Sequence, residues 1–254
     1  MTWNESWQDK AAIVTGGSSG IGKATALALA ERGARVLITG RTPARLAEAS
    51  GADARIAVHE ADSAEPESST AIFEAALERF GRLDLIVNNA GAGAPLPVED
   101  YNAATIAEMC AVNILGPSLL VKAALPALRQ SKGAVVNIGT AVSRGAAPGL
   151  AHYGATKAAL ESLTRSWAIE LARDWIRVNA VSPGPVKSGA LTGMMGLPGE
   201  VARGIEEQEA AQIPLGRRGV PGDVVPWILH LGNPQSEWLT GQVLTVDGGW
   251  SLRG

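Results

Sequence analysis

Seven short runs rich in β-branched residues recur along the chain, separated by longer alanine-rich segments, and this alternation constrains the fold more than any other feature. The runs are apolar on both faces and are bounded by Gly, Asn or Pro, as expected of strands buried in a parallel sheet. Helical patterns lie between them, and two of these, residues 22–33 and 66–81, end at a glycine. The alternation predicts an α/β fold with one parallel sheet covered by helices on both faces. The predicted strands cover residues 11–15, 34–39, 55–60, 83–89, 133–139, 176–182 and 242–247.

The 254 residues are enough for one large domain or two small ones, so length alone does not decide. No linker rich in Pro, Gly or Ser and no repeat divides the chain, which predicts one domain over residues 1–254. The least regular stretch, residues 183–220, surrounds one short helical pattern with glycines, prolines and two methionines. Insertions of this kind in compact domains are often functional lids. We therefore predict a substrate lid at about residues 189–213.

Charge, cysteine content and hydropathy exclude several classes of protein. The net charge of −3 provides no basic surface, so no nucleic-acid partner is expected. A single cysteine, Cys110, excludes an internal disulfide and a cysteine-based zinc site, and no metal is expected. The N-terminus lacks the cationic start and apolar stretch of a signal peptide, and no stretch approaches the apolar length of a membrane helix. These features predict a cytoplasmic protein that does not contact membranes.

Three glycines follow the first predicted strand with the spacing Gly16-x-x-x-Gly20-x-Gly22. Glycine can adopt positive φ and lets the backbone approach a pyrophosphate, while the N-terminus of the next helix offers free N–H groups to it. The alternative is an ordinary glycine turn between a strand and a helix. If the turn holds a dinucleotide, the predicted contacts are Gly16, Ser18, Ser19, Gly20, Ile21 and Gly22.

The residues after the second strand indicate which dinucleotide is bound. An NAD-binding fold has Asp or Glu here to bind the ribose 2′-hydroxyl, whereas this chain has Gly40, followed by Arg41 and Thr42. A carboxylate repels a 2′-phosphate, and a guanidinium can bind one with two hydrogen bonds. The sequence therefore predicts NADP(H) as the cofactor. The alternative is a solvated arginine in a surface loop.

Short polar or glycine-containing segments follow three further strands, at the sheet edge where ligands bind in such folds. We predict that they contact adenine after the third strand, the ribose after the fourth and the nicotinamide after the sixth. Each segment also has a structural explanation. The first can be a helix cap, the second a turn stabilised by asparagine side chains, and the third a plain turn at the end of a strand. The residues concerned are Asp62, Ser63, Asn89, Ala90, Gly91, Pro183, Gly184, Val186 and Ser188.

Tyr153 and Lys157 lie four residues apart in an alanine-rich run of helical character, which places them on one helix face. A nearby cation stabilises a phenolate, so Lys157 is expected to lower the pKa of Tyr153 from about 10. Such a tyrosine can give a proton to a forming alkoxide or remove one from an alcohol. In isolation, the same spacing is more typical of an ordinary surface helix.

Reduction of a carbonyl group also requires a donor to the negative charge that develops on its oxygen. The end of the fifth strand offers two hydroxyl groups, those of Thr140 and Ser143. The structural alternative is that both residues only cap or turn the backbone.

Taken together, the segments TGGSSGIG, NNAG, YGATK, SPGPVKS and GQVLTVDGGW have the order and spacing found in the short-chain dehydrogenase/reductase family. The chain resembles this family from about residue 10 onwards, and within it most resembles 3-oxoacyl-ACP reductase-like ketoreductases. The resemblance implies a doubly wound Rossmann fold, hydride transfer at C4 of a nicotinamide and commonly a homotetramer. It also implies that the C-terminal segment lies at a subunit interface.

The same resemblance implies a role for each of four residues. Tyr153 is the catalytic acid or base, Lys157 lowers its pKa and holds the nicotinamide ribose, and Asn113 holds a water molecule in a proton relay. Thr140 stands where the family has a serine. It keeps the hydroxyl but has a stiffer side chain, and Ser143 is the alternative donor.

The sequence thus predicts an NADP(H)-dependent oxidoreductase that interconverts a ketone and a secondary alcohol, with a small molecule as substrate. One alternative is an NAD-linked alcohol dehydrogenase of the same family, if Arg41 points to solvent. The alternative outside enzymes is a non-catalytic NADP-binding regulator. Residues expected near the pocket, including Met194 and Met195, are mostly apolar, which favours an uncharged carbonyl compound. Arg144 is the one charge expected there.

Overall fold

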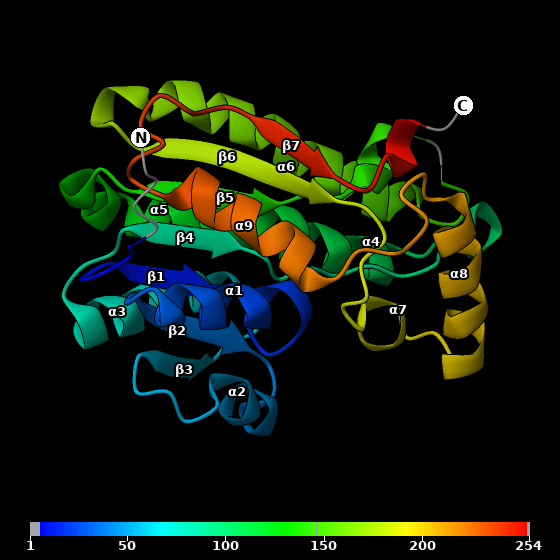
Figure 1. Cartoon of the computed structure of the whole chain (residues 1–254), viewed down its shortest axis with the longest axis horizontal. Helices are drawn as coiled ribbons and strands as arrows, with labels where there is room; N and C mark the ends of the chain where they lie inside the picture. Colours follow the sequence, from blue (N-terminus) through cyan, green and yellow to red (C-terminus); the bar gives the residue numbers. More distant parts are fainter. Residues whose placement is uncertain (1–5, 146, 253–254) are drawn as a thin grey trace.

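The computed structural model describes residues 6–145 and 147–252 of the chain. All seven strands belong to one parallel sheet in the order β3-β2-β1-β4-β5-β6-β7 (Figure 1). Every predicted strand is present, so the predicted α/β fold is confirmed. The strands are β1 (Ala11–Val14), β2 (Arg35–Gly40), β3 (Ile56–Glu60), β4 (Leu85–Asn88), β5 (Ala134–Ile138), β6 (Arg177–Pro183) and β7 (Val243–Val246).

Helices cover both faces of the sheet (Figure 1). Side chains of α1 and α9 form the core on one face, and those of α3, α5 and α6 form the core on the other. Successive residues of a strand point to opposite faces, so Val14 of β1 belongs to the first core and Ile13 to the second. The helices are α1 (Gly20–Glu31), α2 (Pro43–Ser50), α3 (Pro66–Phe80), α4 (Ala103–Cys110), α5 (Gly116–Ser131), α6 (Ala151–Glu170), α7 (Ala190–Gly193), α8 (Gly199–Gln212) and α9 (Pro221–Gly232). Short helical turns are η1 (Val98–Asp100), η2 (Ala111–Leu115), η3 (Ala141–Arg144), η4 (Ala172–Asp174) and η5 (Trp250–Leu252).

The two edge strands depart from the prediction that every strand is buried on both faces. Only Ile56 of β3 is buried, and all four residues of β7 are partly exposed. Each of these strands has a neighbouring strand on one side only. β7 is as apolar as the central strands, so its hydrophobicity did not distinguish an edge from the middle of the sheet, whereas β3 ends in the polar residues His59 and Glu60.

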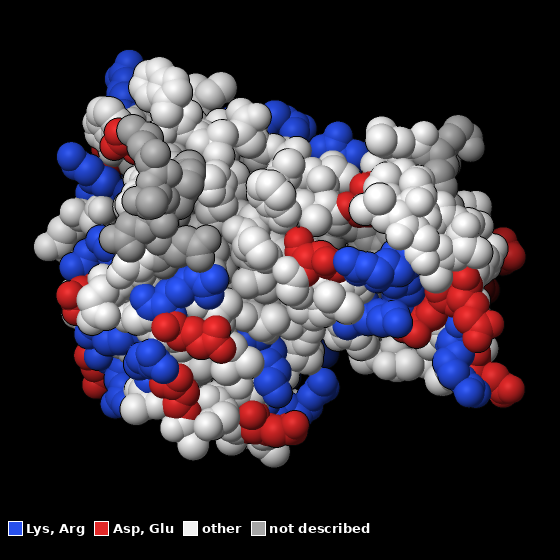
Figure 2. All heavy atoms as spheres, viewed as in Figure 1, with Lys and Arg blue, Asp and Glu red and all other residues white. Residues whose placement is uncertain are grey.

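The strand order reverses at β1 and β4, which pair with each other although β2 and β3 come between them in the sequence. The loops after two such strands run in opposite directions and leave a crevice at the carboxyl edge of the sheet. Helices α7 and α8 lie beyond the same edge (Figure 1). Figure 2 shows a hollow between the region of these two helices and that of α1 and α2, and acidic and basic side chains are mixed over this face.

One helical stretch, Ala103–Ser131, is long and apolar enough to cross a membrane by length and composition, with a mean hydropathy of 1.6 in its most apolar part. The prediction that no stretch approaches this length is therefore wrong. The stretch comprises α4, η2 and α5, and five buried apolar residues of α5 pack in the core shared with α3. These contacts are those of a core helix, although only 39 % of the window is buried.

Candidate active site

The turn between β1 and α1 requires glycine at all three positions of the predicted spacing, Gly16, Gly20 and Gly22. Gly16 has a φ of +64°, and a Cβ there would lie 2.9 Å from the Cα of Ala90. A Cβ on Gly22 would lie 2.4 Å from Asn89 Nδ2. Helix α1 begins directly after Ser19, whose side chain does not cap it, and no acidic residue lies in its first turn. The first amides of α1 therefore have no side-chain acceptor from this residue, and the helix start favours an anion.

The loop after β4 is held against this turn by two side chains. Asn89 Nδ2 donates to the carbonyl oxygens of Thr15 (2.8 Å) and Gly16 (3.1 Å). The Thr15 hydroxyl accepts from the backbone amides of Asn89 (3.1 Å) and Ala90 (3.0 Å). Asn89 and Ala90 thus build the wall of the crevice. Thr15 is a part of it that the sequence did not indicate.

The ends of β2 and β3 carry the residues predicted for the adenosine end of the cofactor. A Cβ on Gly40 would lie 3.5 Å from Ser18 Oγ, so the glycine turn and the end of β2 are neighbours. Arg41 is exposed, and no hydrogen bond or ion pair to another residue in the described ranges engages it. Thr42 precedes α2 without capping it through its side chain. Asp62 Oδ1 accepts from the Ala64 amide (2.9 Å), so this carboxylate stabilises the turn after β3.

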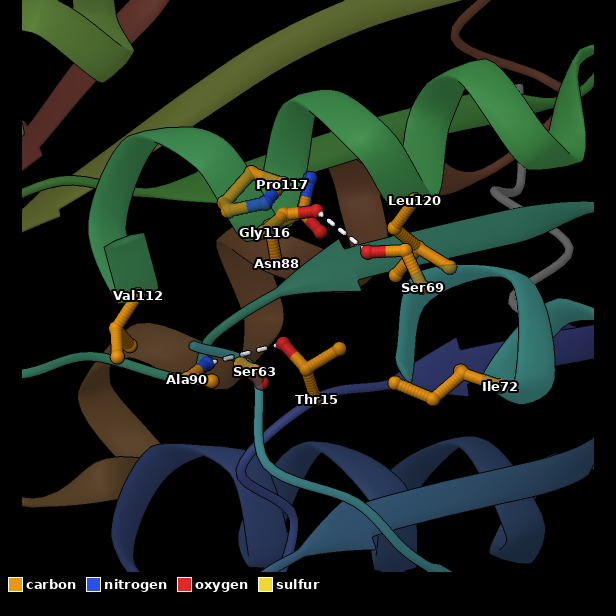
Figure 3. A pocket seen from close by; sticks show the side chains of 10 residues that line it. All are labelled: Thr15, Ser63, Ser69, Ile72, Asn88, Ala90, Val112, Gly116, Pro117 and Leu120. Atoms are coloured by element: carbon orange, nitrogen blue, oxygen red, sulfur yellow. Dashed lines mark hydrogen bonds between the residues drawn. The ribbon is translucent and has the colours of Figure 1, made fainter. Parts of the chain in front are cut away.

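A small pocket lies beneath these turns, between β1, β4, α3 and α5 (Figure 3). Asn88 is buried in its wall, and Asn88 Oδ1 has no hydrogen-bond partner among the described residues. The lining contains none of the predicted catalytic residues, so we do not assign the pocket to the substrate. It is lined by Thr15, Ser63, Ser69, Ile72, Asn88, Ala90, Val112, Gly116, Pro117 and Leu120.

Tyr153 and Thr140 meet at the carboxyl edge of the sheet. Tyr153 comes from the first turn of α6, and Thr140 directly precedes η3 after β5. Both residues are buried, and the Thr140 side chain is the group that opposes the effect of burial on the Tyr153 pKa. The second candidate hydroxyl, Ser143 Oγ, lies instead 2.6 Å from the Thr140 carbonyl oxygen and 2.9 Å from Glu161 Oε1. Of the two hydroxyl groups, that of Thr140 is the one that acts on Tyr153.

Lys157 lies one helical turn beyond Tyr153 and is only 3 % exposed. Its ammonium group donates to the carbonyl oxygen of Ile138 (2.9 Å) at the end of β5. A Cβ on Gly91 would lie 3.4 Å from Lys157 Nζ and 3.5 Å from Asn113 Oδ1. The Lys157 ammonium and the Asn113 side-chain oxygen therefore lie next to Gly91. A Cβ at this position would occupy the space beside both groups.

Asn113 is fully buried in η2, a π-helical turn between α4 and α5. Its Nδ2 donates to the carbonyl oxygen of Ala92 (2.8 Å) and to the hydroxyl of Thr156 (2.9 Å), and its Oδ1 accepts from the Ala92 amide (2.9 Å). The side chain thus fixes the loop after β4 to α6.

The pKa values of the pair differ from the expectation from sequence. Burial raises the pKa of Tyr153 above its usual value, and the group that acts in the opposite direction is Thr140 rather than Lys157. Burial lowers the pKa of Lys157 to about 8, against the opposing effect of the Glu161 charge. The expected lowering of the Tyr153 pKa by Lys157 is therefore not found in the described structure. The lysine ammonium is bonded to a backbone carbonyl instead.

The segment after β6 covers the glycine turn and Tyr153. A Cβ on Gly20 would lie 2.9 Å from the Ser188 carbonyl oxygen, and one on Gly93 would lie 2.8 Å from the Tyr153 ring and 3.3 Å from Met194 Cε. Met194 and Met195 pack against the cluster formed by Leu96, Met109 and Tyr153. Residues 189–213 contain α7 in addition to the one helical pattern that the sequence indicated.

Arg218 joins this segment to the body of the protein. Its guanidinium is buried, forms ion pairs with Glu206 and Glu209 of α8 (2.9 Å for Glu209), and donates to the Val186 carbonyl oxygen (3.2 Å). Val186 also pairs with Gly219 in an isolated bridge. Arg218 therefore fixes α8 to the segment that follows Pro183 and Gly184.

Arg144, the charge expected near the substrate, donates to the Val243 carbonyl oxygen (3.3 Å) and acts electrostatically on Asp247. A Cβ on Gly184 would lie 2.5 Å from the Cβ of Asp247, so the loop after β6 packs directly against the end of β7. Arg144 thus contacts β7 and its following turn.

The residues present fit a dinucleotide. The glycine turn leaves space that a side chain would fill, the start of α1 favours an anion, and Gly91 keeps open the space next to Lys157. The described residues contain no cluster of three or more His, Cys, Asp or Glu side chains that could hold a metal ion.

Comparisons with known proteins agree with this geometry. A family model described as enoyl-(acyl carrier protein) reductase matches residues 16–251. The short-chain dehydrogenase/reductase FrzI of Cladobotryum sp is 38% identical over 95% of this chain and 95% of its own. The 3-oxoacyl-[acyl-carrier-protein] reductase FabG of Thermotoga maritima is 34% identical over 95% of this chain and 98% of its own.

Two solved structures are similar over nearly the whole chain. One is a Caenorhabditis elegans short-chain dehydrogenase/reductase of unknown function with cofactor, with a TM-score of 0.91, 34% identity and coverage of 98% of this chain and 97% of the other. The second is a 3-ketoacyl-(acyl-carrier-protein) reductase from Brucella melitensis complexed with NADH, with a TM-score of 0.89, 31% identity and coverage of 97% and 100%. The chain belongs to the short-chain dehydrogenase/reductase family of oxidoreductases.

Proposed function

We propose that the protein is an NADP(H)-dependent oxidoreductase that reduces a ketone to a secondary alcohol and catalyses the reverse oxidation. The observation that carries this proposal is that the buried side chains of Tyr153 and Thr140 lie beside each other, one helical turn from Lys157. Two adjacent hydroxyl groups can bind a single carbonyl oxygen, which is what stabilisation of a forming alkoxide requires.

The bound cofactor supplies a hydride from C4 of its nicotinamide ring. Thr140 and Tyr153 donate hydrogen bonds to the substrate oxygen, and Tyr153 gives its proton to the alkoxide. The raised pKa of Tyr153 keeps the phenol protonated at neutral pH, as a proton donor must be. Lys157 holds the nicotinamide ribose, and Asn113 keeps the loop after β4 in place beside it. Overall, ketone, NADPH and a proton become alcohol and NADP⁺.

The cofactor contacts are proposed from the crevice geometry. The glycine turn (Gly16, Ser18, Ser19, Gly20, Ile21 and Gly22) binds the pyrophosphate, and Arg41 and Thr42 bind the 2′-phosphate. Exposure of Arg41 beside Gly40, where a carboxylate would stand in an NAD site, supports NADP(H). The adenine and nicotinamide contacts come from Asp62, Ser63, Asn89, Ala90, Gly91, Pro183, Gly184, Val186 and Ser188.

The substrate is proposed to be a small, moderately hydrophobic ketone, because Met194 and Met195 pack beside Tyr153. In this proposal, residues 1–254 form one domain, residues 189–213 act as a substrate lid, and the chain forms a homotetramer in the cytoplasm. An NAD-linked enzyme is the second candidate, because the Brucella melitensis relative was crystallised with NADH.

A test combines a panel of small ketones with each of the two reduced cofactors. We expect kcat/KM to be roughly ten- to a hundredfold higher with NADPH than with NADH, because one charged hydrogen bond to a phosphate contributes about 1.5–3 kcal/mol. Tyr153→Phe should abolish turnover while NADPH still binds, measured by nucleotide fluorescence. Full turnover in this variant would contradict the mechanism, and a preference for NADH would select the second candidate. NADPH binding without turnover of any ketone in the wild type would favour a regulator.

A further inference from the structure

A buried carboxylate lies next to the proposed site, and the mechanism above does not use it. Glu161 is on α6, one helical turn beyond Lys157 and two beyond Tyr153, and is only 7 % exposed. Spacing of four residues places all three side chains along one face of the helix. A carboxylate is rarely buried to this degree unless hydrogen bonds or a nearby cation stabilise its charge.

The Glu161 carboxylate joins the ends of two strands. Glu161 Oε1 accepts from Ser182 Oγ of β6 (2.6 Å) and from Ser143 Oγ of η3 (2.9 Å). A Cβ on Gly139 would lie 2.9 Å from this oxygen and 2.5 Å from Ser182 Oγ. The carboxylate is therefore held directly against the chain that leaves β5, in space that only a glycine leaves free.

Through Ser143, the Glu161 carboxylate is also connected to Thr140, the residue proposed to bind the substrate oxygen. The Ser143 hydroxyl lies 2.6 Å from the Thr140 carbonyl oxygen as well as 2.9 Å from the carboxylate. Thr140 is only one residue beyond Gly139, and its side chain lies beside Tyr153. Glu161 thus fixes both sides of the segment that carries the Thr140 hydroxyl.

The same carboxylate acts on Lys157 through its charge. Burial lowers the pKa of Lys157 to about 8, and the negative charge of Glu161 raises it against that effect. On α6 the other titratable neighbour is Tyr153, which is neutral at pH 7 because burial raises its pKa. Two further groups lie near the Lys157 ammonium: the Ile138 carbonyl of β5 and the Asn113 side-chain amide of η2. Neither of them titrates.

We propose that Glu161 is a positioning residue for the reaction: its carboxylate anchors the Thr140 segment through Ser143 and provides the anionic neighbour of Lys157. The proposal rests on the proposed function, since it assigns Thr140 and Lys157 their parts in carbonyl reduction. A purely structural role, as a link between β5 and β6, would require the hydrogen bonds but not the charge.

Two variants separate the charge from the hydrogen bonds. Glu161→Gln keeps a side-chain oxygen that accepts from Ser182 and Ser143 but removes the charge, whereas Glu161→Ala removes both. Glu170→Gln is the matched control, because it removes an exposed carboxylate from the end of the same helix. All variants are compared as the full chain, with thermal melting to verify folding.

The first readout is the charge of Lys157 itself, followed without cofactor by ¹H–¹⁵N NMR of its ammonium group and assigned with Lys157→Arg. In Glu161→Gln we expect the titration midpoint to fall by on the order of one pH unit, since an opposite charge nearby is lost. Glu170→Gln should leave it unchanged. An unchanged midpoint in Glu161→Gln overturns the proposal, whatever the enzyme proves to catalyse.

The second readout is ketone reduction as a function of pH. We expect Glu161→Gln to keep its maximal kcat within about threefold of the wild type. The pH at which kcat/KM falls on the alkaline side should decrease together with the titration midpoint of Lys157. Glu161→Ala should lose about tenfold or more in kcat with a smaller change in the cofactor KM. A Glu161→Ala variant with full kcat would overturn the anchoring role. Absence of ketone reduction in the wild type would instead contradict the proposed function, and the NMR titration would then decide the effect of Glu161 on Lys157.

Discussion

A single methyl group separates Thr140 from the serine that the family has at this position. The methyl makes the threonine side chain stiff about χ1, so its hydroxyl has few alternative directions. In the structure, this hydroxyl accepts from the Val142 amide (3.3 Å), and the side chain lies beside Tyr153. The hydroxyl of the stiffer residue is thus held at the start of η3, and we expect it to donate to a substrate oxygen shared with Tyr153.

Thr140→Ala should reduce kcat about a hundredfold or more, because loss of one donor to an oxyanion costs roughly 2.7–4 kcal/mol in comparable sites. Thr140→Ser should stay within about threefold of the wild type, since it keeps the donor. Ser143→Ala should cost less than Thr140→Ala, because Ser143 Oγ contacts the Thr140 carbonyl and Glu161. Steady-state reduction of one ketone by the three variants measures this. A larger loss for Ser143→Ala than for Thr140→Ala would reverse the assignment.

At the residue scale, sequence identified positions better than interactions. The prediction that Tyr153, Lys157 and Thr140 lie at one end of the sheet follows from their spacing on one helix face and at a strand end. The sequence did not indicate the role of Glu161, although it continues the same four-residue spacing. Its partner Ser182 lies on β6, the next strand along the chain, and only the packing of α6 against this strand brings the two together. The direction of the Tyr153 pKa was also missed, because the burial of Tyr153 depends on its packing with residues such as Leu96 and Met109.

At the scale of elements, helix α8 is fixed to the body largely through Arg218. The buried guanidinium contacts Glu206 and Glu209 of α8 and the Val186 carbonyl at once. If this ion cluster is broken, two carboxylates of α8 lose their cation, and the helix loses its connection to the segment that follows β6.

Arg218→Ala should lower the free energy of unfolding by roughly 1–3 kcal/mol, less than for a fully buried pair because both glutamates are partly exposed. It should also raise the substrate KM and speed proteolysis within residues 189–213, measured by limited trypsin digestion and urea unfolding. Arg217→Ala is the matched control, since the neighbouring arginine pairs with Asp223 at the surface. Equal effects of the two substitutions would show that α8 does not depend on Arg218.

The strands were predictable because alternation of apolar runs with helical segments depends on local sequence. The exposure of β7 was not predictable, because β7 is as apolar as a central strand and differs in having one neighbour. The π-helical turn η2 was also not predicted. It interrupts an otherwise continuous apolar helix at Asn113. The side-chain amide of Asn113 is hydrogen-bonded to the backbone of Ala92, in the loop after β4. Such long-range bonds are invisible in a local pattern.

At the scale of the whole molecule, the sheet leaves the β7 edge open and places apolar side chains beside it. Leu215 and Leu252 are 77 % and 86 % exposed. They flank one turn, because the Leu215 amide donates to the Gly248 carbonyl and the Leu252 amide to the Gly249 carbonyl. All four residues of β7 are partly exposed beside them. An apolar patch that continues along an open strand edge is suited to pairing with a second copy of the chain.

The homotetramer proposed above should therefore depend on this patch. We expect the wild type to elute as a tetramer at about 10 μM subunit concentration, and Leu252→Glu to shift it to dimers or monomers, since each copy would bury a charge in the contact. Val58→Glu is the matched control, because Val58 is exposed on β3, the opposite edge of the same sheet. Size-exclusion chromatography with light scattering distinguishes the species. A tetramer that survives Leu252→Glu and dissociates with Val58→Glu would move the interface to the other edge, and a wild type that is monomeric would exclude the tetramer.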